Sequence, residues 1–150
     1  YPVRAGQPVL VHAAAGGVGQ IMVQWLKAIG AEVIATVGSP AKADLVRQLG
    51  ADHVILYREQ DVAAEVRRIT GGSGVPVAYD SVGADTFEGT LKSLARRGMF
   101  VSFGNASGPA PPFGSRAGMV GIVVSQQEVG DLVRGTAGRP QFAGQPVELE

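Results

Sequence analysis

Short apolar runs alternate along the chain with longer segments in which apolar residues recur every three or four positions. The apolar runs are residues 9–13, 32–37, 53–57, 75–80 and 99–103. Runs of this length, apolar almost throughout and rich in valine, are typical of strands that are buried on both faces. The pattern therefore predicts a strand at each of these places.

The segments between the runs have the periodicity of helices that bury one face. They are residues 17–29, 40–49, 61–70 and 85–97. The side chains expected to face the core are Val18, Met22, Trp25 and Ile29 in the first segment, Leu45, Val46 and Leu49 in the second, Val62, Val66 and Ile69 in the third, and Phe87, Leu91 and Leu94 in the fourth.

Capping residues mark several of the expected helix ends. Gly30 ends the first helix, and Ser39 followed by Pro40 begins the second. Arg96 and Arg97 place positive charge at the expected C-terminus of the fourth helix, where cations are favourable.

Strands and helices that alternate this regularly require right-handed crossovers and a parallel sheet covered on both faces. The predicted fold class is therefore α/β, a doubly wound parallel sheet of the Rossmann type in three α/β/α layers. A chain of 150 residues is long enough for one such core. We expect residues 1–150 to form a single dinucleotide-binding domain.

The periodic pattern weakens after Gly104. Residues 105–114 are rich in proline and glycine, which predicts a loop. Residues 119–124 are a candidate sixth strand, and Ser125 followed by Glu128 predicts a capped helix that continues to Val133. Residues 135–150 have no clear periodicity, so the segment 114–150 is treated as a tail without an assigned structure.

Composition narrows the possible functions. The formal net charge is zero and 17% of the residues are charged, a balance that favours neither nucleic acid nor a membrane surface as a partner. The absence of cysteine excludes disulfides and any zinc site with cysteine ligands in this chain. No signal segment and no membrane-spanning run is found, so a cytoplasmic location is expected.

The first predicted strand leads into a glycine-rich turn that resembles a phosphate-binding loop. Residues 14–19 follow the pattern G-x-G-x-x-G, except that Ala14 stands at the first glycine position. The residues expected at the pyrophosphate are Ala15, Gly16, Gly17 and Val18. The free N–H groups and partial positive charge of the following helix favour an anion there. The alternative is a tight turn without a ligand.

The end of the second predicted strand indicates which dinucleotide binds. Loops that select NAD end this strand with an acidic residue, whereas this chain has Gly38 and Ser39 there. Lys42, one helical turn further on, can present its ammonium group to a 2′-phosphate, and Tyr57 ends the neighbouring strand. Together they predict NADPH as the cofactor. The alternative is an ordinary helix cap, a solvated lysine and a surface tyrosine.

Two further strand ends are expected to flank the nicotinamide. They carry Ser81 and Val82 after the fourth strand, and Phe103, Gly104 and Asn105 after the fifth. Backbone groups at Val82 and Gly104 are candidates to bond the carboxamide.

No catalytic or metal-binding residue is assigned. We expect Asp80, which precedes a glycine turn, to cap a loop rather than act in catalysis. His12 and His53 lack a third ligand, so we expect hydrogen-bonded histidines and no metal site.

Taken together, these motifs resemble the quinone oxidoreductase group of medium-chain dehydrogenases, the zeta-crystallin-like reductases. The similarity runs through residues 9–19, 36–42, 57–59, 79–83 and 96–105, and covers about residues 5–113. It implies zinc-free reduction of quinones or activated alkenes by NADPH in a homodimer. It also implies an N-terminal substrate domain of the GroES-like type, which this sequence does not contain. The family's usual continuation is not recognisable after Gly114.

Two other functions fit the same motifs. One is an NADPH-binding module or fragment without catalytic activity, and the other is the enoyl reductase domain of a polyketide synthase. A sixth strand at residues 119–124 would form an apolar sheet edge, through which two copies of the chain can pair as a homodimer.

Overall fold

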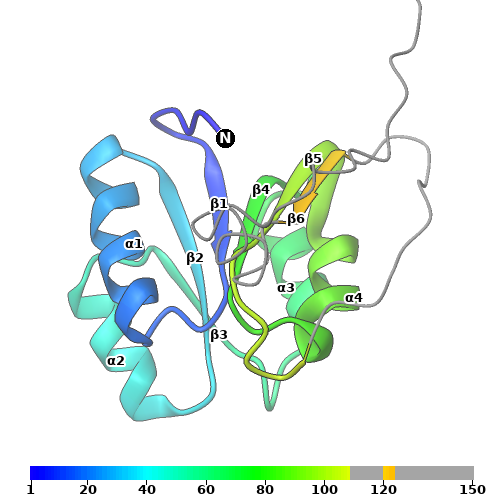
Figure 1. Ribbon diagram of the computed structural model, residues 1–150. Coiled ribbons are helices and arrows are strands. Elements are labelled where there is room, and N and C mark those ends of the chain that lie inside the picture. Colours follow the sequence, from blue (N-terminus) through cyan, green and yellow to red (C-terminus); the bar gives the residue numbers. More distant parts are fainter. Residues whose placement is uncertain (109–119, 124–150) are drawn as a thin grey trace, which may run out of the picture.

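The structure is a computed structural model that describes residues 1–108 and 120–123. It contains a parallel six-stranded sheet with the strand order β3-β2-β1-β4-β5-β6 (Figure 1). The strands are β1 (Pro8–Val11), β2 (Glu32–Val37), β3 (His53–Leu56), β4 (Val75–Asp80), β5 (Leu94–Ser102) and β6 (Val120–Val123). The helices are α1 (Gly17–Ile29), α2 (Pro40–Gln48), α3 (Val62–Ile69) and α4 (Ala84–Ser93).

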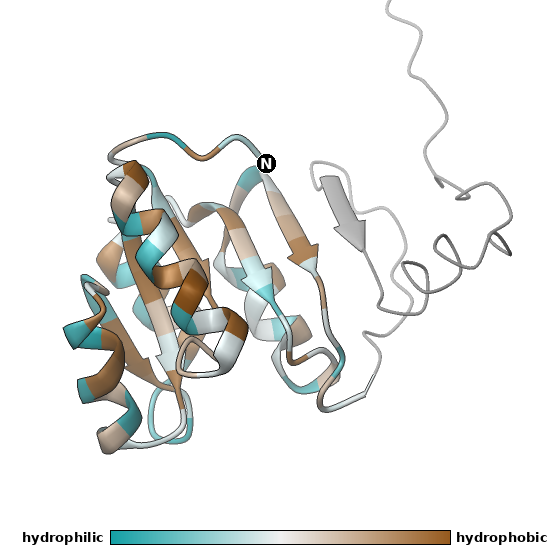
Figure 2. Cartoon of the chain, turned by 60° about the vertical axis from the view of Figure 1, so that its left-hand side comes forward, coloured by the Kyte–Doolittle hydropathy of each residue, from teal (hydrophilic) through white to brown (hydrophobic). Residues whose placement is uncertain are grey.

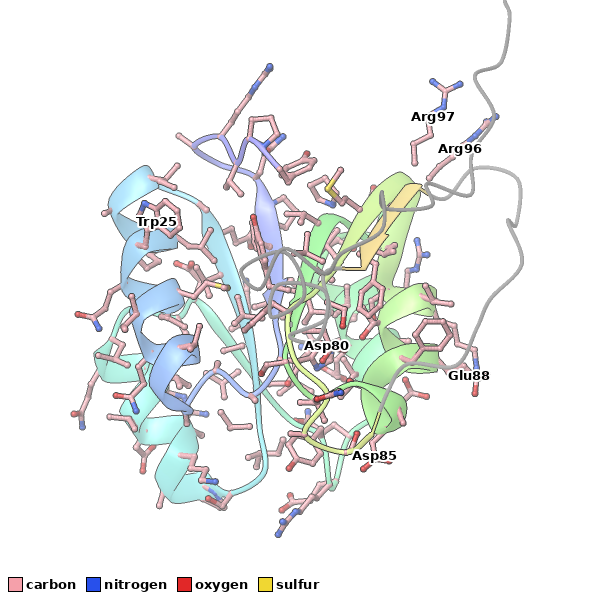
Figure 3. The ribbon with its side chains drawn as sticks, viewed as in Figure 1. Trp25, Asp80, Asp85, Glu88, Arg96 and Arg97 are labelled. Atoms are coloured by element: carbon pink, nitrogen blue, oxygen red, sulfur yellow. The ribbon has the colours of Figure 1, made fainter. Side chains whose placement is uncertain are left out.

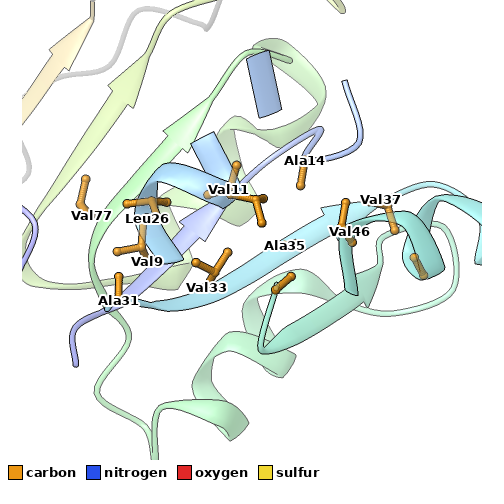
Figure 4. Close-up of a cluster of buried hydrophobic side chains, with 13 residues drawn as sticks. Val9, Val11, Ala14, Leu26, Ala31, Val33, Ala35, Val37, Val46 and Val77 are labelled. Carbon is orange, nitrogen blue, oxygen red and sulfur yellow. The ribbon is translucent and has the colours of Figure 1, made fainter. Parts of the chain in front are cut away.

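The helices cover both faces of the sheet and form three layers. Figure 1 shows α1 and α2 on one side and α3 and α4 on the other. Val9 and Val11 pack in a core cluster with Leu26 of α1 and Val46 of α2, part of which is drawn in Figure 4. Leu10, between them in β1, points to the opposite face, where its cluster includes Val66, Phe87 and Phe100.

These layers confirm the predicted doubly wound fold. β1 and β2 are apolar at almost every position because they bury side chains on both faces of the sheet, and brown stretches that mark apolar residues run along the central strands in Figure 2. The sixth strand is also confirmed, since β6 pairs in parallel with β5 and forms the edge of the sheet. Ser39 caps α2 and Pro40 begins it, as expected.

The predicted buried stripe of α1 is wrong at Val18 and Trp25, whereas Met22 is partly buried against the core as expected. Val18 is 57% exposed and Trp25 is 67% exposed, whereas the buried residues of this helix are Gly19, Val23 and Leu26. The helix is apolar on several sides, so periodicity alone allowed two orientations. Gly19 lies against the backbone of the preceding turn, and this contact fixes which face turns inward.

The fourth helix ends earlier than the sequence pattern predicts. α4 stops at Ser93, and β5 begins at the next residue. Arg96 and Arg97 lie in β5 rather than at a helix C-terminus, so the predicted dipole interaction is wrong. Between the pairs Val75–Leu94 and Val77–Met99 the register shifts, and Arg97 adopts a φ of 63° within this bulge.

Arg67 of α3 accounts for this early end. Its guanidinium donates to the carbonyl oxygens of Lys92 at 2.9 Å, Leu94 at 2.9 Å and Gly72 at 2.7 Å. Carbonyls at the end of a helix need partners other than the next helical turn. The arginine supplies them from the neighbouring helix, and the chain leaves α4 directly into β5.

Several predictions for the C-terminal part lie outside the described residues. They are the end of the loop 105–114, the capped helix from Ser125 to Val133 and the segment 135–150.

Replacing Arg67 with alanine should lower the free energy of unfolding by about 2 kcal/mol, because three carbonyl groups at the end of α4 and the loop after α3 lose a charged donor. The matched control is Arg68→Ala, because this exposed neighbouring arginine bonds only Glu65 among the described residues. We expect that control to stay near the unsubstituted chain in urea unfolding. Equal losses for both variants would contradict this function of Arg67.

Candidate functional site

The turn between β1 and α1 brings the helix unusually close to the strand. A Cβ atom on Gly19 would collide with the carbonyl oxygen of Ala13 and would lie 2.7 Å from the Cα of Ala14. Ala13 adopts a φ of 49°, a left-handed conformation that is strained for alanine. Ala14 is fully buried, so alanine is accommodated at the first glycine position of the motif.

The N-terminus of α1 is open. Its N-cap residue Gly16 offers no side-chain cap, and its first turn has no acidic residue. Within residues 1–108 and 120–123, the N–H groups of Gly17, Val18 and Gly19 have no hydrogen-bond acceptor. A Cβ atom on Gly17 would meet nothing within 4 Å. This helix end therefore presents unpaired donors and open space, which together suit an anion.

Beside this turn, the end of β2 carries the residues predicted to select NADPH. A Cβ atom on Gly38 would lie 2.7 Å from the hydroxyl oxygen of Tyr57, so glycine is needed for the ring to lie against the strand end. The Ser39 hydroxyl accepts a hydrogen bond from the Lys42 N–H at 3.5 Å. The Lys42 side chain is exposed and has no ion-pair partner in the described part of the chain.

These elements border a cleft of about 360 Å³ at the carboxyl ends of the strands. One part of its lining is Ala13, Ala15, Gly16, Val37, Gly38, Lys42 and Tyr57, from the turn after β1 and the ends of β2 and β3. The other part is His12, Thr36, Gln60, Val62, Val82, Asp85, Thr86 and Gly89. The cleft thus lies where ligands bind in open parallel sheets.

The opposite wall of the cleft contains the N-terminus of α4, which is closed to anions. Asp80 is fully buried and its Oδ1 accepts from the N–H groups of Val82 at 2.7 Å and Gly83 at 3.2 Å. The N–H of Ala84 donates to the carbonyl of Gly108 at 3.0 Å, and Asp85 adds a negative charge in the first turn. Figure 3 shows Asp80 near the middle of the molecule and Asp85 near its lower border. Asp80 caps this turn, as predicted.

A buried histidine links the two walls beneath the cleft. His12 Nδ1 lies 3.0 Å from Thr36 Oγ1, and His12 Nε2 lies 2.9 Å from Thr90 Oγ1. Desolvation by burial lowers the pKa of His12, and the nearby Asp80 carboxylate opposes that shift without cancelling it. His53 is bonded to Glu32 Oε1 at 2.8 Å, so both histidines have hydrogen-bond partners, as expected.

The structure brings only some of the predicted site residues into the cleft. Those that line it are Ala15, Gly16, Gly38, Lys42, Tyr57 and Val82. Gly17 and Val18 form the first turn of α1 beside it, and Ser39 caps α2. Val82, expected at the nicotinamide, therefore shares a cleft with Gly38 and Lys42. Its N–H and carbonyl are already bonded to Asp80 and Ser107, which leaves its side chain as the group to face a ligand.

The remaining predicted residues lie together, outside the lining of the cleft. The N–H of Phe103 donates to the Asp80 carbonyl at 2.9 Å, and a Cβ atom on Gly104 would lie 2.7 Å from the Ser81 carbonyl oxygen. The carbonyl of Asn105 accepts from the N–H of Gly108 at 2.9 Å. The ends of β4 and β5 are thus adjacent, as predicted.

Sequence reasoning missed part of the site. It did not identify Gln60, Val62, Asp85, Thr86 and Gly89 in the cleft lining, or the pairing of His12 with Thr36 and Thr90. A usable signal was present in α4, where Thr86 and Thr90 are four residues apart and lie beside the buried Phe87.

Metal and membrane features can be assessed for the described residues. Among them, no group of three or more histidine, cysteine, aspartate or glutamate side chains is arranged to hold a metal ion. In the same part of the chain, no helix has the length and apolar character needed to cross a bilayer.

The fold is a doubly wound parallel sheet of the Rossmann type, with a cleft at the carboxyl ends of its strands. The model of the zinc-binding dehydrogenase family matches residues 17–138, and the chain belongs to that family.

Several of the similar curated proteins are quinone oxidoreductases. The chain is 57% identical over 109 residues to a quinone oxidoreductase from Salmonella typhimurium, an alignment that covers 73% of this chain and 33% of that protein. It is 52% identical over 112 residues to a 2-haloacrylate reductase from a Burkholderia species, covering 75% of this chain and 34% of that protein. The chain spans about a third of the length of the curated relatives it matches.

A solved structure agrees with these relatives. It is the quinone oxidoreductase of Escherichia coli complexed with NADPH, which superposes with a TM-score of 0.77 at 46% identity. The superposition covers 85% of this chain and 40% of that one.

The close approach at Gly19 gives a stability prediction. Gly19→Ala should lower the free energy of unfolding by about 3 kcal/mol, because the new methyl group overlaps backbone atoms that cannot move aside. Gly17→Ala places the same methyl group in open space two residues earlier, and should change the free energy by less than about 0.5 kcal/mol. Thermal unfolding of the two variants provides the comparison. If Gly19→Ala were as stable as Gly17→Ala, the close contact between Gly19 and the backbone of the preceding turn would be contradicted.

Proposed function

We propose that this chain is the NADPH-binding domain of a zinc-free oxidoreductase that transfers hydride from NADPH to quinones or activated alkenes. One observation carries the proposal, namely that a single cleft joins the open N-terminus of α1 to Lys42, with no acidic residue at the end of β2. The first feature suits a pyrophosphate, and the second suits a 2′-phosphate that NADH lacks. The NADPH complex of the related Escherichia coli enzyme supports the choice of cofactor.

In this proposal the adenosine half of the cofactor occupies the cleft. Ala15, Gly16, Gly17 and Val18 hold the pyrophosphate through backbone N–H groups and the space that glycine leaves. Gly38, Ser39, Lys42 and Tyr57 hold the 2′-phosphate. The position of Val82 in the same cleft supports an apolar contact with the adenosine half.

The nicotinamide half is assigned to the adjacent ends of β4 and β5. Ser81, Phe103, Gly104 and Asn105 lie there, next to the cleft wall formed by Val82. NADPH, when bound, supplies the hydride. The residues of this chain bind the cofactor and orient it, and no side chain of the chain is assigned as an acid or base.

Hydride reduction of a quinone requires no metal, and this chain has no cysteine to ligate zinc. The proposed acceptors, quinones or activated alkenes, correspond to the names of the quinone oxidoreductase and 2-haloacrylate reductase relatives. Those relatives are about three times as long as the aligned region, so the choice of acceptor is part of this proposal rather than a property of the comparison.

A homodimer and a cytoplasmic location belong to the same proposal. β6 is the edge strand of the sheet, with one side unpaired among the described residues. Pairing with a second copy would continue the sheet across a two-fold axis.

Replacing Lys42 with alanine should weaken NADPH binding by about 1 to 3 kcal/mol, the scale of a lost charge-assisted hydrogen bond. NADH binding should be nearly unchanged, because NADH has no 2′-phosphate. The control is Lys92→Ala, which removes a lysine paired with Glu88 on α4. Calorimetric titration of each variant with both cofactors measures the effect. Equal losses for both cofactors would show that Lys42 does not bind the 2′-phosphate.

The activity is tested by titrating the chain with NADPH and then adding 1,4-benzoquinone or 9,10-phenanthrenequinone. We expect saturable binding and a quinone-dependent loss of NADPH absorbance that Lys42→Ala slows. Binding without turnover would favour a non-catalytic module. Turnover of crotonoyl coenzyme A alone would favour an enoyl reductase, and absence of NADPH binding would contradict all three functions.

The oligomeric state follows from the exposed edge of the sheet. Sedimentation equilibrium should give a mass twice that of the 15.4 kDa chain. A monomer at all concentrations would remove the proposed pairing through β6.

A further inference from the structure

A chain of buried hydrogen bonds crosses the molecule beneath the cleft. It runs from Thr36 in β2 through His12 to Thr90 in α4, with lengths of 3.0 and 2.9 Å. All three residues are at most 1% exposed. Asp80 lies next to this series of hydrogen bonds. Its Oδ2 is 3.3 Å from Thr90 Oγ1 and accepts a hydrogen bond from the Thr86 hydroxyl at 2.6 Å.

The directions of these bonds follow from the available protons. The Thr90 hydroxyl donates to the Thr86 carbonyl at 2.7 Å, the shorter of its two possible donations, and Asp80 Oδ2 lies 3.3 Å away. Thr90 must then accept from His12 Nε2–H. Burial lowers the pKa of His12, so the ring carries a single proton at neutral pH. Nδ1 is then an acceptor to which the Thr36 hydroxyl donates, and the imidazole makes one hydrogen bond to each side.

The two ends of this chain belong to the two walls of the cleft. Thr36 is followed directly by Val37 and Gly38, and Lys42 lies on the helix after them. Thr90 lies one helical turn from Thr86, which lines the other wall. In the described part of the chain, His12 is the only side chain that bonds to both β2 and α4.

Stability alone does not require a polar group here. Buried polar groups add little net stability over well-packed apolar side chains of the same shape. They do restrict geometry, because each bond is satisfied at only one separation of its partners. Here the partners are the two walls.

Building on the proposed function, we propose that His12 is a positioning residue that holds the two walls of the cleft at the separation required by an adenine dinucleotide. It contacts no transferred atom. It acts through Thr36 on the wall that holds the 2′-phosphate, and through Thr90 on the wall formed by α4.

The first test uses the chain without nucleotide. Thr36→Val and Thr90→Val each remove one hydroxyl and keep the side-chain shape. We expect a cross-wall effect in hydrogen exchange. Thr36→Val should speed exchange of the α4 amides at residues 87–90 about fivefold. Thr90→Val should do the same for the amides of Ala14 and Tyr57, which bond to the carbonyls of Thr36 and Val37.

Matched controls separate this effect from simple loss of stability. Thr36→Ser and Thr90→Ser keep the hydroxyl groups and should restore slow exchange. Thr70→Val removes a hydroxyl that bonds to Val66 and Gly74 and does not line the cleft, so it should leave the amides of both walls unchanged. Faster exchange confined to the substituted side, or equally present in Thr70→Val, would overturn the proposal.

The second test measures cofactor binding. Thr36→Val and Thr90→Val should raise the Kd for NADPH about fivefold and that for NADH less than about twofold. The difference is expected because only NADPH must fit its 2′-phosphate to one wall while its adenosine contacts both. If the valine variants lost the same affinity for both cofactors, or if neither serine variant recovered NADPH affinity, His12 would have a structural role only. If the unsubstituted chain does not bind NADPH, the proposed function fails, and the exchange experiment still decides whether His12 joins the walls.

Discussion

The contact between Gly19 and the backbone of Ala13 and Ala14 is the constraint on which the site depends. No side chain fits between helix and strand there, so the rotation and starting point of α1 are fixed by the turn itself. As a result, the N–H groups of α1 that have no acceptor among the described residues lie beside the cleft, next to Gly16 in its lining. The other helix end in the cleft, that of α4, has its donors bonded to Asp80 and nearby loop atoms. The two helix N-termini at the cleft therefore differ: that of α1 is open to an anion, and that of α4 is closed.

Most of the fold follows from the sequence because the first four strands are largely apolar and one helix lies between each two successive strands from β1 to β5. β2 and β4 begin and end where the pattern predicts. The errors have a common physical origin, since both concern contacts that a helix makes with residues outside it. The rotation of α1 depends on the approach of Gly19 to Ala14, and the end of α4 depends on Arg67 of another helix. Periodicity within a helix contains neither piece of information.

The candidate site likewise contains residues that local sequence patterns reveal and contacts that only the tertiary structure reveals. Gly16, Gly38 and Lys42 could be found because a glycine-rich turn and a strand end without an acid are local patterns. The hydrogen bond between His12 and Thr90 could not be predicted, because these residues are 78 positions apart and neither has a distinctive neighbour in the sequence. Only the strand order, which sets β1 between β2 and β4, makes the histidine central.

The exposed position of Trp25 has a practical consequence. It is the only tryptophan of the chain, it is 67% exposed on α1, and Val18 and Ile21 on the same helix are also exposed. Its fluorescence will be that of an indole already in water, so unfolding of the core will barely change its emission maximum. A blue shift will instead report that something has covered the outer face of α1. The natural fluorophore of this domain is thus a sensor of contacts on its surface rather than of its folding.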